Sequence, residues 1–313
     1  MICDNNFIMQ TCVALMSLYA NKKIETEYVI SVIMADCDQS AIECIQQMEK
    51  DKFAIGIIET SVGQYQQIKQ LAHVPLASLL KFDICNLVSQ YDKLLYLDGD
   101  IIVRQDLSNL YDTYLGENYV AGVAHSIGIL TGEKKLNGGV LLFNARKIRE
   151  EKLRDVFIQT RQALGDRKSM DQETFHVVFA NKKCYLSPNY NVMLDKIDYE
   201  KKYYSMQAYN TFYETTYRSR SDVINKAVII HFTGSLKPWK YTFATCAGEW
   251  HQYYKLVFRD KEVIHRKGRI AYLKEIMQRD GIRGIYWMAK DKFLAFLGEY
   301  FKIFPDKSHG EWN

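Results

Sequence analysis

The chain has 313 residues, of which 48% are hydrophobic, so it is long enough to bury a large core. Its formal net charge is +4, and the basic excess lies after residue 250, where 13 lysines and arginines face 8 aspartates and glutamates; the near-neutral main body does not fit a nucleic-acid-binding protein. Seven scattered cysteines without a Cys-x-x-Cys pair, and the lack of an apolar run of about eighteen residues, argue against a zinc ribbon, a disulfide framework and a membrane span.

Short β-rich runs alternate with segments of helical period along the first two-thirds of the chain. This alternation predicts an α/β fold, with a mostly parallel sheet flanked by helices. The predicted strands are residues 28–34, 53–58, 93–97, 119–123 and 139–143. The predicted helices are residues 10–19, 38–50, 76–88 and 145–163. No repeat or low-complexity linker is present, so we expect one catalytic domain over residues 1–250 and a helical tail over residues 251–313.

The predicted strand at 93–97 runs directly into two aspartates, Asp98 and Asp100, which are separated by Gly99 and followed by another apolar run. Residues at i and i+2 of an extended segment point the same way, so the two carboxylates would repel each other. A hard divalent ion such as Mg²⁺ or Mn²⁺ removes this conflict, because it accepts carboxylate oxygens and keeps phosphate oxygens as further ligands. The alternative interpretation is a surface turn between two strands.

Further polar segments lie next to the other predicted strands, and ligands of open α/β sheets bind at the carboxyl ends of strands. They are residues 3–7 (Cys-Asp-Asn-Asn-Phe), His125, residues 137–139 (Asn-Gly-Gly), residues 171–173 (Asp-Gln-Glu) and residues 231–239 (His-Phe-Thr-Gly-Ser-Leu-Lys-Pro-Trp). His231 can complete a metal site begun by two carboxylates, while Gly234 lets the backbone approach a phosphate and Lys237 supplies a charge for it. Each piece has a plain structural alternative, such as a hydrogen-bonded histidine or a Gly-Ser turn, but together they indicate a site.

These motifs, in this order over roughly residues 1–250, resemble glycosyltransferase family 8, the retaining transferases that include bacterial lipopolysaccharide and lipooligosaccharide galactosyl- and glucosyltransferases. The resemblance implies the GT-A fold, a Rossmann-like fold of nucleotide-diphospho-sugar transferases. It also implies that Asp98, Asp100 and His231 bind Mn²⁺, with Mg²⁺ as the alternative ion, next to the phosphates of a UDP-sugar donor.

The resemblance implies further roles residue by residue. The donor-binding positions are Asp4 and Asn6 for the uridine, Phe7 for a stack on uracil, Gly234 and Lys237 for the diphosphate, and Lys81, Gly99, Asn137 and Gly138 beside them. Asp171 and Gln172 resemble the family's Asp-Gln pair under the anomeric carbon, so we expect these two and Asn137 to be catalytic. A covalent intermediate would need a strong nucleophile, whereas Gln172 offers a weak amide. We therefore expect same-face attack, assisted by the leaving phosphate oxygen.

The chain departs from the family pattern at several positions. Lys81 stands where many members have an arginine, Glu173 replaces the commoner aspartate, and His125 stands where some galactosyltransferases have an acidic residue. These departures leave the sugar open between UDP-galactose and UDP-glucose. Only Met1 and Ile2 precede the Cys-Asp motif, where the family has a full strand, so we expect an incomplete first strand.

The segment 269–304 combines aromatic and basic side chains at helical spacing. They are Tyr272, Tyr286, Trp287, Phe293, Phe296, Tyr300, Phe301 and Phe304, with Lys274, Arg279, Arg283, Lys290, Lys292 and Lys302. Such helices lie at the interface of anionic membranes, which predicts a peripheral membrane protein with a lipid-linked acceptor. The alternative is that these aromatics pack on the catalytic domain. No secretory signal occupies the first twenty residues, so we expect a cytoplasmic location, at the inner face of the membrane.

Together these observations predict a Mn²⁺-dependent hexosyltransferase that uses UDP-galactose or UDP-glucose. Its expected acceptor is a hydroxyl of a bacterial surface glycan or glycolipid, such as the lipopolysaccharide core. One alternative is a transferase that acts on a protein or glycogen-like primer, which the 22 tyrosines leave open. Another is a non-catalytic UDP-sugar-binding protein, which would be expected to lack the metal ligands or the Asp-Gln pair.

Overall fold

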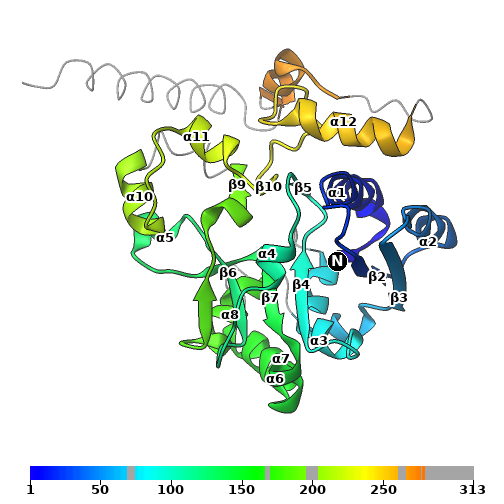
Figure 1. The fold of residues 1–313 in the computed structure, drawn as a ribbon, viewed down its shortest axis with the longest axis vertical. Helices are drawn as coiled ribbons and strands as arrows, with labels where there is room; N and C mark the ends of the chain where they lie inside the picture. Colours follow the sequence, from blue (N-terminus) through cyan, green and yellow to red (C-terminus); the bar gives the residue numbers. More distant parts are fainter. Residues whose placement is uncertain (69–74, 166–169, 195–203, 260–265, 276, 279–313) are drawn as a thin grey trace, which may run out of the picture.

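The computed structural model describes residues 1–68, 75–165, 170–194, 204–259, 266–275 and 277–278. Its first sheet consists of the parallel strands β1 (Ile2–Cys3), β2 (Tyr28–Ala35) and β3 (Phe53–Thr60), in that order. β2 and β3 are rich in valine and isoleucine, whose branched side chains fit the pleated surface of a sheet. α2 (Gln39–Gln46) packs on β3 and on α1 (Ile8–Ala20), as Figure 1 shows in blue.

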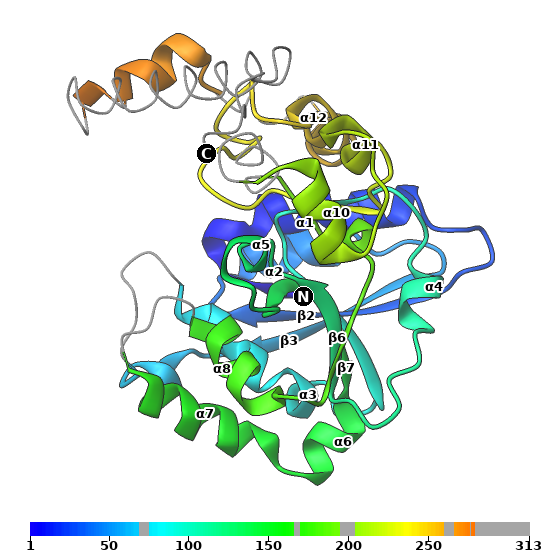
Figure 2. The same cartoon turned by 90° about the vertical axis from the view of Figure 1, so that its left-hand side faces the viewer.

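The second sheet has the order β4-β7-β6-β8. Its strands are β4 (Lys93–Leu97), β7 (Leu136–Asn144), β6 (Val120–Ala124) and β8 (Lys183–Tyr185). α6 (Ala145–Glu150), α7 (Leu153–Leu164) and α8 (Met170–Phe179) lie beneath this sheet in Figure 2, and a cluster of phenylalanines fills the space between them. The predicted α/β fold with helices flanking the sheet is thus confirmed, and each of the five predicted strands is present.

A third, small sheet joins segments that are distant in sequence. Its order is β5-β10-β9, with β5 (Ile101–Val103), β10 (Ile229–His231) and β9 (Val192–Met193). β10 is antiparallel to β5 and places His231 opposite Ile101, directly after the second carboxylate of the Asp-Gly-Asp turn. The pairs β4–β7 and β6–β7 are also antiparallel, so the second and third sheets are mixed, whereas the first sheet is parallel.

Three predicted helices differ from the observed ones for local reasons. The predicted helix 145–163 is divided into α6 and α7, because Lys152 adopts the left-handed conformation with φ 53°. The predicted helix 76–88 is divided into a 3₁₀ helix, η3 (Leu76–Phe82), and α3 (Ile84–Leu87), and between them the Asp83 side chain bonds to Tyr65 and Arg154. The predicted helix 38–50 ends at Gln46, since the chain turns back into β3.

The remaining elements connect these layers. They are η1 (Asn5–Phe7), η2 (Gly63–Tyr65), α4 (Ser108–Tyr111), α5 (Gly128–Thr131), η4 (Pro188–Tyr190), α10 (Met206–Tyr213), α11 (Arg220–Asn225) and α12 (Ala247–Phe258). α10 packs on α5, and both lie at the same end of the molecule as α11 and the third sheet (Figure 1).

α12 crosses the predicted domain boundary at residue 250 and packs on α1. Trp250 and Tyr254 are buried in the same cluster as Trp239, so the first part of the predicted tail belongs to the folded core. Tyr272 packs against Tyr241 and Phe243, which agrees for this residue with the alternative of aromatic packing. The other tail aromatics lie outside the described residues, and no helix in the described part of the chain is long and apolar enough to cross a membrane.

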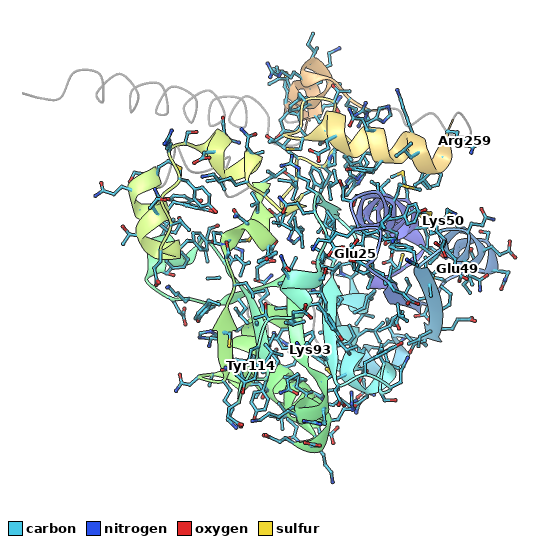
Figure 3. The ribbon with its side chains drawn as sticks, in the orientation of Figure 1. Glu25, Glu49, Lys50, Lys93, Tyr114 and Arg259 are labelled. Carbon is cyan, nitrogen blue, oxygen red and sulfur yellow. The ribbon has the colours of Figure 1, made fainter. Side chains whose placement is uncertain are left out.

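A cavity of about 330 Å³ lies along β2 and β4 and is lined mainly by apolar side chains. Lys93, the first residue of β4 and labelled in Figure 3, is one of its lining residues. None of the predicted site residues lines this cavity. It is therefore not the candidate site.

An ion pair fastens α12 to the third sheet. Arg104 follows β5 and donates to both carboxylate oxygens of Glu249, at 2.8 Å and 2.5 Å, and also to the carbonyl of Ile224. Both side chains are largely buried, with 20% and 25% exposed. Removing one partner leaves the other charge unpaired and largely buried. This lowers the free energy of unfolding more than the loss of a surface ion pair does.

We therefore expect Arg104→Met to lower the free energy of unfolding by about 1–3 kcal/mol in urea denaturation. Arg146→Met is the matched control, because Arg146 pairs with Asp92 at 3.5 Å while both side chains are well exposed. Its expected cost is below about 0.5 kcal/mol. Equal losses in the two variants would contradict the role assigned to the Arg104 pair.

Candidate functional site

The Asp-Gly-Asp turn lies at the carboxyl end of β4, between the second and third sheets. Asp98 follows β4, and Asp100 precedes β5. A Cβ atom on Gly99 would lie 2.7 Å from Thr11 Oγ1 and 3.0 Å from Phe7 Cδ1, so only glycine fits between the two carboxylates. The turn is thus pressed against η1 and α1, and Asp100 is only 8% exposed. The alternative of a plain surface turn is wrong for this reason.

His231, the last residue of β10 in the third sheet, lies next to the two carboxylates. Its Nε2 lies 3.1 Å from Asp100 Oδ1 and 3.8 Å from Asp98 Oδ2. One ligand atom from each of the three residues lies within 4.8 Å of the others, and His231 is 4% exposed. Two carboxylate oxygens and one imidazole nitrogen at this spacing fit a divalent cation such as Mn²⁺ or Mg²⁺. The three residues predicted as metal ligands are therefore brought together.

Lys237 brings a positive charge next to Asp100. Its Nζ lies 2.7 Å from Asp100 Oδ2 and also donates to the carbonyl of Phe232. Burial alone would raise the pKa of Asp100, but His231 and Lys237 outweigh it and hold that pKa well below its usual range. Gly234, three residues before Lys237, has φ 77°, a left-handed conformation that favours glycine in the turn after β10.

Lys81, on η3, connects the first carboxylate to Asp171. Its Nζ lies 2.9 Å from Asp171 Oδ2, 3.3 Å from Asp98 Oδ1 and 3.0 Å from the carbonyl oxygen of Gly138. Burial alone would lower the pKa of Lys81, but the carboxylates of Asp171 and Asp98 raise it well above its ordinary value. The buried side chain therefore stays an ammonium ion that bridges two acids.

The Asn-Gly-Gly segment of β7 forms the floor between these groups. A Cβ on Gly138 would lie 2.8 Å from Asp171 Oδ2 and 3.3 Å from Gln172 Cγ, so the start of α8 sits directly on this backbone. Asn137 is 3% exposed, and its Oδ1 accepts the backbone N–H of Gly139 at 3.0 Å. The predicted catalytic residues Asn137, Asp171 and Gln172 are thus gathered near Asp98, Asp100 and His231.

The predicted uridine residues lie at the end of β1. Asp4 caps η1 by accepting the backbone N–H of Asn6 at 2.9 Å. Phe7, the last residue of η1, contacts Trp239 edge to face with ring centroids 6.0 Å apart, and its ring also lies against Gly99. η1 therefore reaches the carboxylate turn through Phe7.

The residues that depart from the family pattern are engaged with the protein itself. Glu173 pairs with Lys135 at 2.9 Å. His125 accepts the backbone N–H of Ile127 at its Nδ1, with 3.1 Å between the nitrogens. Both contacts lie on the side of the site formed by α8 and the loop between β6 and β7.

Two residues that the sequence analysis missed contact the carboxylates or the imidazole. Asn191, which is 1% exposed, lies with its Oδ1 2.9 Å from His231 Nδ1, and its Nδ2 donates to Asn137 Oδ1 at 2.8 Å. Tyr96 donates to Asp98 Oδ1 at 2.5 Å. Tyr96 belongs to an apolar strand and carries no signal in the sequence. Asn191 carries a weak one, because it is a polar residue directly before a strand, β9.

A comparison with protein families matches residues 1–243 to the model described as Glycosyl transferase family 8. The chain belongs to this family. The match covers β1 to β10 together with every predicted site residue. The resemblance inferred from the motifs is thus confirmed.

Proteins similar to this chain include bacterial transferases. The chain is 27% identical to Glycosyltransferase GlyD of Streptococcus pneumoniae over 75% of its own length but only 28% of the length of GlyD. It is 24% identical to the Lipopolysaccharide 1,2-glucosyltransferase of Escherichia coli, over 75% of this chain and 71% of that protein. Its fold is similar to that of the galactosyltransferase LgtC, solved with donor and acceptor sugar analogues, with a TM-score of 0.67, 22% identity, and coverage of 84% and 95% of the two chains. These similarities confirm the GT-A fold.

The contact between Lys237 and Asp100 leads to a prediction about metal binding. The Lys237 ammonium competes with a cation for Asp100, so in Lys237→Met we expect Mn²⁺ affinity without nucleotide to rise by about threefold to thirtyfold. UDP affinity in the presence of Mn²⁺ should fall, since the charge assigned to the diphosphate is lost. Calorimetric titration with Mn²⁺ and then with UDP measures both effects. Lys240→Met, an exposed lysine on the same loop, is the control, and weaker Mn²⁺ binding in Lys237→Met would overturn the competition.

Proposed function

We propose that this chain transfers a hexose, galactose or glucose, from a UDP-sugar to a hydroxyl of a bacterial surface glycan such as the lipopolysaccharide core. One observation carries the proposal: the cluster of Asp98, Asp100 and His231 is linked through Lys81 to Asp171 and through Asn191 to Asn137. A sugar diphosphate has a charged diphosphate, which a cation stabilises, and a neutral sugar, whose hydroxyls need hydrogen-bond partners. A cation site near buried hydrogen-bonding groups suits both parts. The relatives that are named glucosyltransferase and galactosyltransferase support the hexose and the glycan acceptor.

The metal in this proposal is Mn²⁺, held by the two aspartates and His231. When bound, the cation supplies Lewis-acid stabilisation of the charge that develops on the departing UDP. Lys237 would leave Asp100 for the diphosphate and add a second positive charge at the same place. The turn at Gly234 would let the backbone come close to the phosphates, and Phe7 would stack on the uracil ring with Asp4 and Asn6 at the uridine.

The sugar in this proposal lies over the Asn137-Gly138 backbone. Asn137 and Asp171 would orient its hydroxyls by hydrogen bonds, which an apolar pocket cannot do. Lys81 donates to Asp171 Oδ2, so this carboxylate is already paired and is a poor nucleophile. Gln172 offers only a neutral amide. We therefore propose same-face attack with retention, in which the leaving phosphate oxygen accepts the proton of the acceptor hydroxyl, and a glycosylated Asp171 or Gln172 trapped by mass spectrometry would contradict it.

UDP release from a panel of UDP-sugars tests the proposal, with Mn²⁺, with Mg²⁺ and with EDTA. We expect slow turnover of UDP-galactose or UDP-glucose that EDTA abolishes and that a lipooligosaccharide acceptor accelerates. Intact mass after incubation with the active donor identifies self-glycosylation, the alternative that a primer-type transferase would show. UDP binding without turnover of any sugar, with the acceptor present, would contradict the proposal and favour a binding protein.

We further propose that residues after 265 bring the enzyme to the inner face of an anionic membrane. The support is the basic and aromatic composition of this segment. Cosedimentation with vesicles that contain anionic phospholipid, before and after removal of residues 266–313, measures this contribution. Unchanged binding after removal would contradict it.

A further inference from the structure

A continuous hydrogen-bond relay runs behind the proposed metal site. The backbone N–H of Gly139 donates to Asn137 Oδ1 at 3.0 Å, and Asn191 Nδ2 donates to the same oxygen at 2.8 Å. Asn191 Oδ1 then lies 2.9 Å from His231 Nδ1. Asn137, Asn191 and His231 are 3%, 1% and 4% exposed, so these contacts are shielded from water. Groups buried this deeply need matched partners.

The first contact of the relay fixes the direction of all the others. A backbone N–H can only donate, so the atom of Asn137 that faces Gly139 must be the amide oxygen. That oxygen can only accept, so the atom of Asn191 that faces it must be the amide nitrogen. The remaining oxygen of Asn191 therefore faces His231 and requires a proton on Nδ1. The other imidazole nitrogen, Nε2, is then left to bind a cation beside Asp98 and Asp100.

We infer that Asn191 is a positioning residue that holds His231 as an Nε2 metal ligand and couples it to the sugar-orienting side chain of Asn137. This inference rests on the metal role proposed above for His231. Histidine ligands commonly donate their second ring nitrogen to an oxygen, which fixes the ring and its protonation. Here that oxygen belongs to a neutral amide, which adds no third negative charge beside the two carboxylates. The same amide also reaches Asn137, so a shift of the imidazole is transmitted to the sugar side.

The place of Asn191 in the fold makes this role possible. It lies between η4 and β9, and β9 is parallel to β10 with Met193 opposite His231. Asn191 therefore directly precedes the strand that pairs with the strand of His231, and its side chain reaches the imidazole. Asn137 enters from β7 of the second sheet, so the relay also joins the two sheets at the site.

Two substitutions separate the parts of the relay. Asn191→Leu removes both hydrogen bonds at similar volume, and we expect Mn²⁺ affinity to fall by about tenfold to a hundredfold. Asn191→Asp still accepts from Nδ1, so its Mn²⁺ affinity should stay within about threefold of the native chain. Its turnover should nevertheless fall, because a carboxylate oxygen would face Asn137 Oδ1. Asn189→Leu is the control, since Asn189 lies in the same segment and bonds to Tyr217 rather than to His231.

Mn²⁺ calorimetry is combined with NMR of the Mg²⁺-loaded, ¹⁵N-histidine-labelled protein. We expect a His231 Nδ1–H proton that is protected from solvent exchange in the native chain and in Asn191→Asp, and that exchanges rapidly in Asn191→Leu. A folded Asn191→Leu variant that binds Mn²⁺ as tightly as the native chain would overturn the inference. A measurement on the native protein alone can also overturn the inference, if its His231 Nδ1–H proton is not protected from solvent exchange. A native chain that binds no divalent cation would instead refute the proposed metal site itself.

Discussion

Replacing Asp100 by alanine is expected to lower Mn²⁺ affinity and sugar transfer by more than about a hundredfold, since it removes a direct ligand rather than a supporting residue. Asp100 is the more buried of the two aspartates, and it contacts both His231 and Lys237. Its loss leaves the Lys237 ammonium and the His231 imidazole without the carboxylate that they share. Steady-state UDP release and Mn²⁺ calorimetry on the same protein preparation measure the two losses.

Asp112→Ala is the matched control for this variant. Asp112 is an exposed aspartate just after α4, so its removal should leave both Mn²⁺ affinity and turnover within about twofold of the native chain. Circular dichroism must show that the Asp100→Ala protein is folded. If it is folded and retains Mn²⁺-dependent turnover within tenfold of the native chain, Asp100 is not a ligand of the catalytic cation.

The second large effect is expected from adding a single methyl group, in Gly139→Ala. The new Cβ would lie 2.2 Å from His231 Cε1, 2.8 Å from His231 Nδ1 and 2.9 Å from Asp98 Oδ2. The imidazole cannot easily move away, because it is buried and its two nitrogens are held by Asn191 and Asp100. We expect Mn²⁺ affinity to fall by about tenfold to a hundredfold and unfolding stability to fall by about 1–3 kcal/mol.

Gly248→Ala provides the comparison, because a Cβ at this position meets no atom within 4 Å. Gly248 lies near the start of α12, where alanine is the better helix former, so this variant should be neutral or more stable by up to about 1 kcal/mol. Calorimetry and urea denaturation apply to both variants. Native Mn²⁺ binding in Gly139→Ala would show that the imidazole can move away without losing the site.

Local sequence patterns predicted the strands whose formation depends on the apolar residues of the strand itself. The apolar runs at 28–34 and 93–97 became β2 and β4, because their side chains suit a buried sheet whatever surrounds them. The Asp-Gly-Asp turn and His231 were predicted to meet because the family motif supplied the distant partner. Nothing local in 101–103 or 229–231 states that these two strands pair.

The predictions that were wrong or incomplete concern features that local sequence patterns do not show. The predicted helix at 145–163 has an unbroken helical period, and only the left-handed Lys152 divides it. Asn191 was missed because its value depends on Asn137 and His231, which are 54 and 40 residues away along the chain. Such contacts arise from tertiary packing. A single sequence therefore indicates which residues carry chemistry more readily than which residues hold them in place.

The small third sheet gives a bound cation an influence beyond catalysis. Asp100 and His231 are 131 positions apart along the chain. Asp100 directly precedes β5 and His231 is the last residue of β10, and each of these strands has only three residues. A cation that ties them together would act as a reversible cross-link across a long loop. At a concentration a hundred times its dissociation constant, it would stabilise the folded chain by about 2.7 kcal/mol. The melting temperature should therefore rise with Mn²⁺ and fall with a chelator, and the amides of β5 and β10 should be among the first to exchange once the cation is withdrawn.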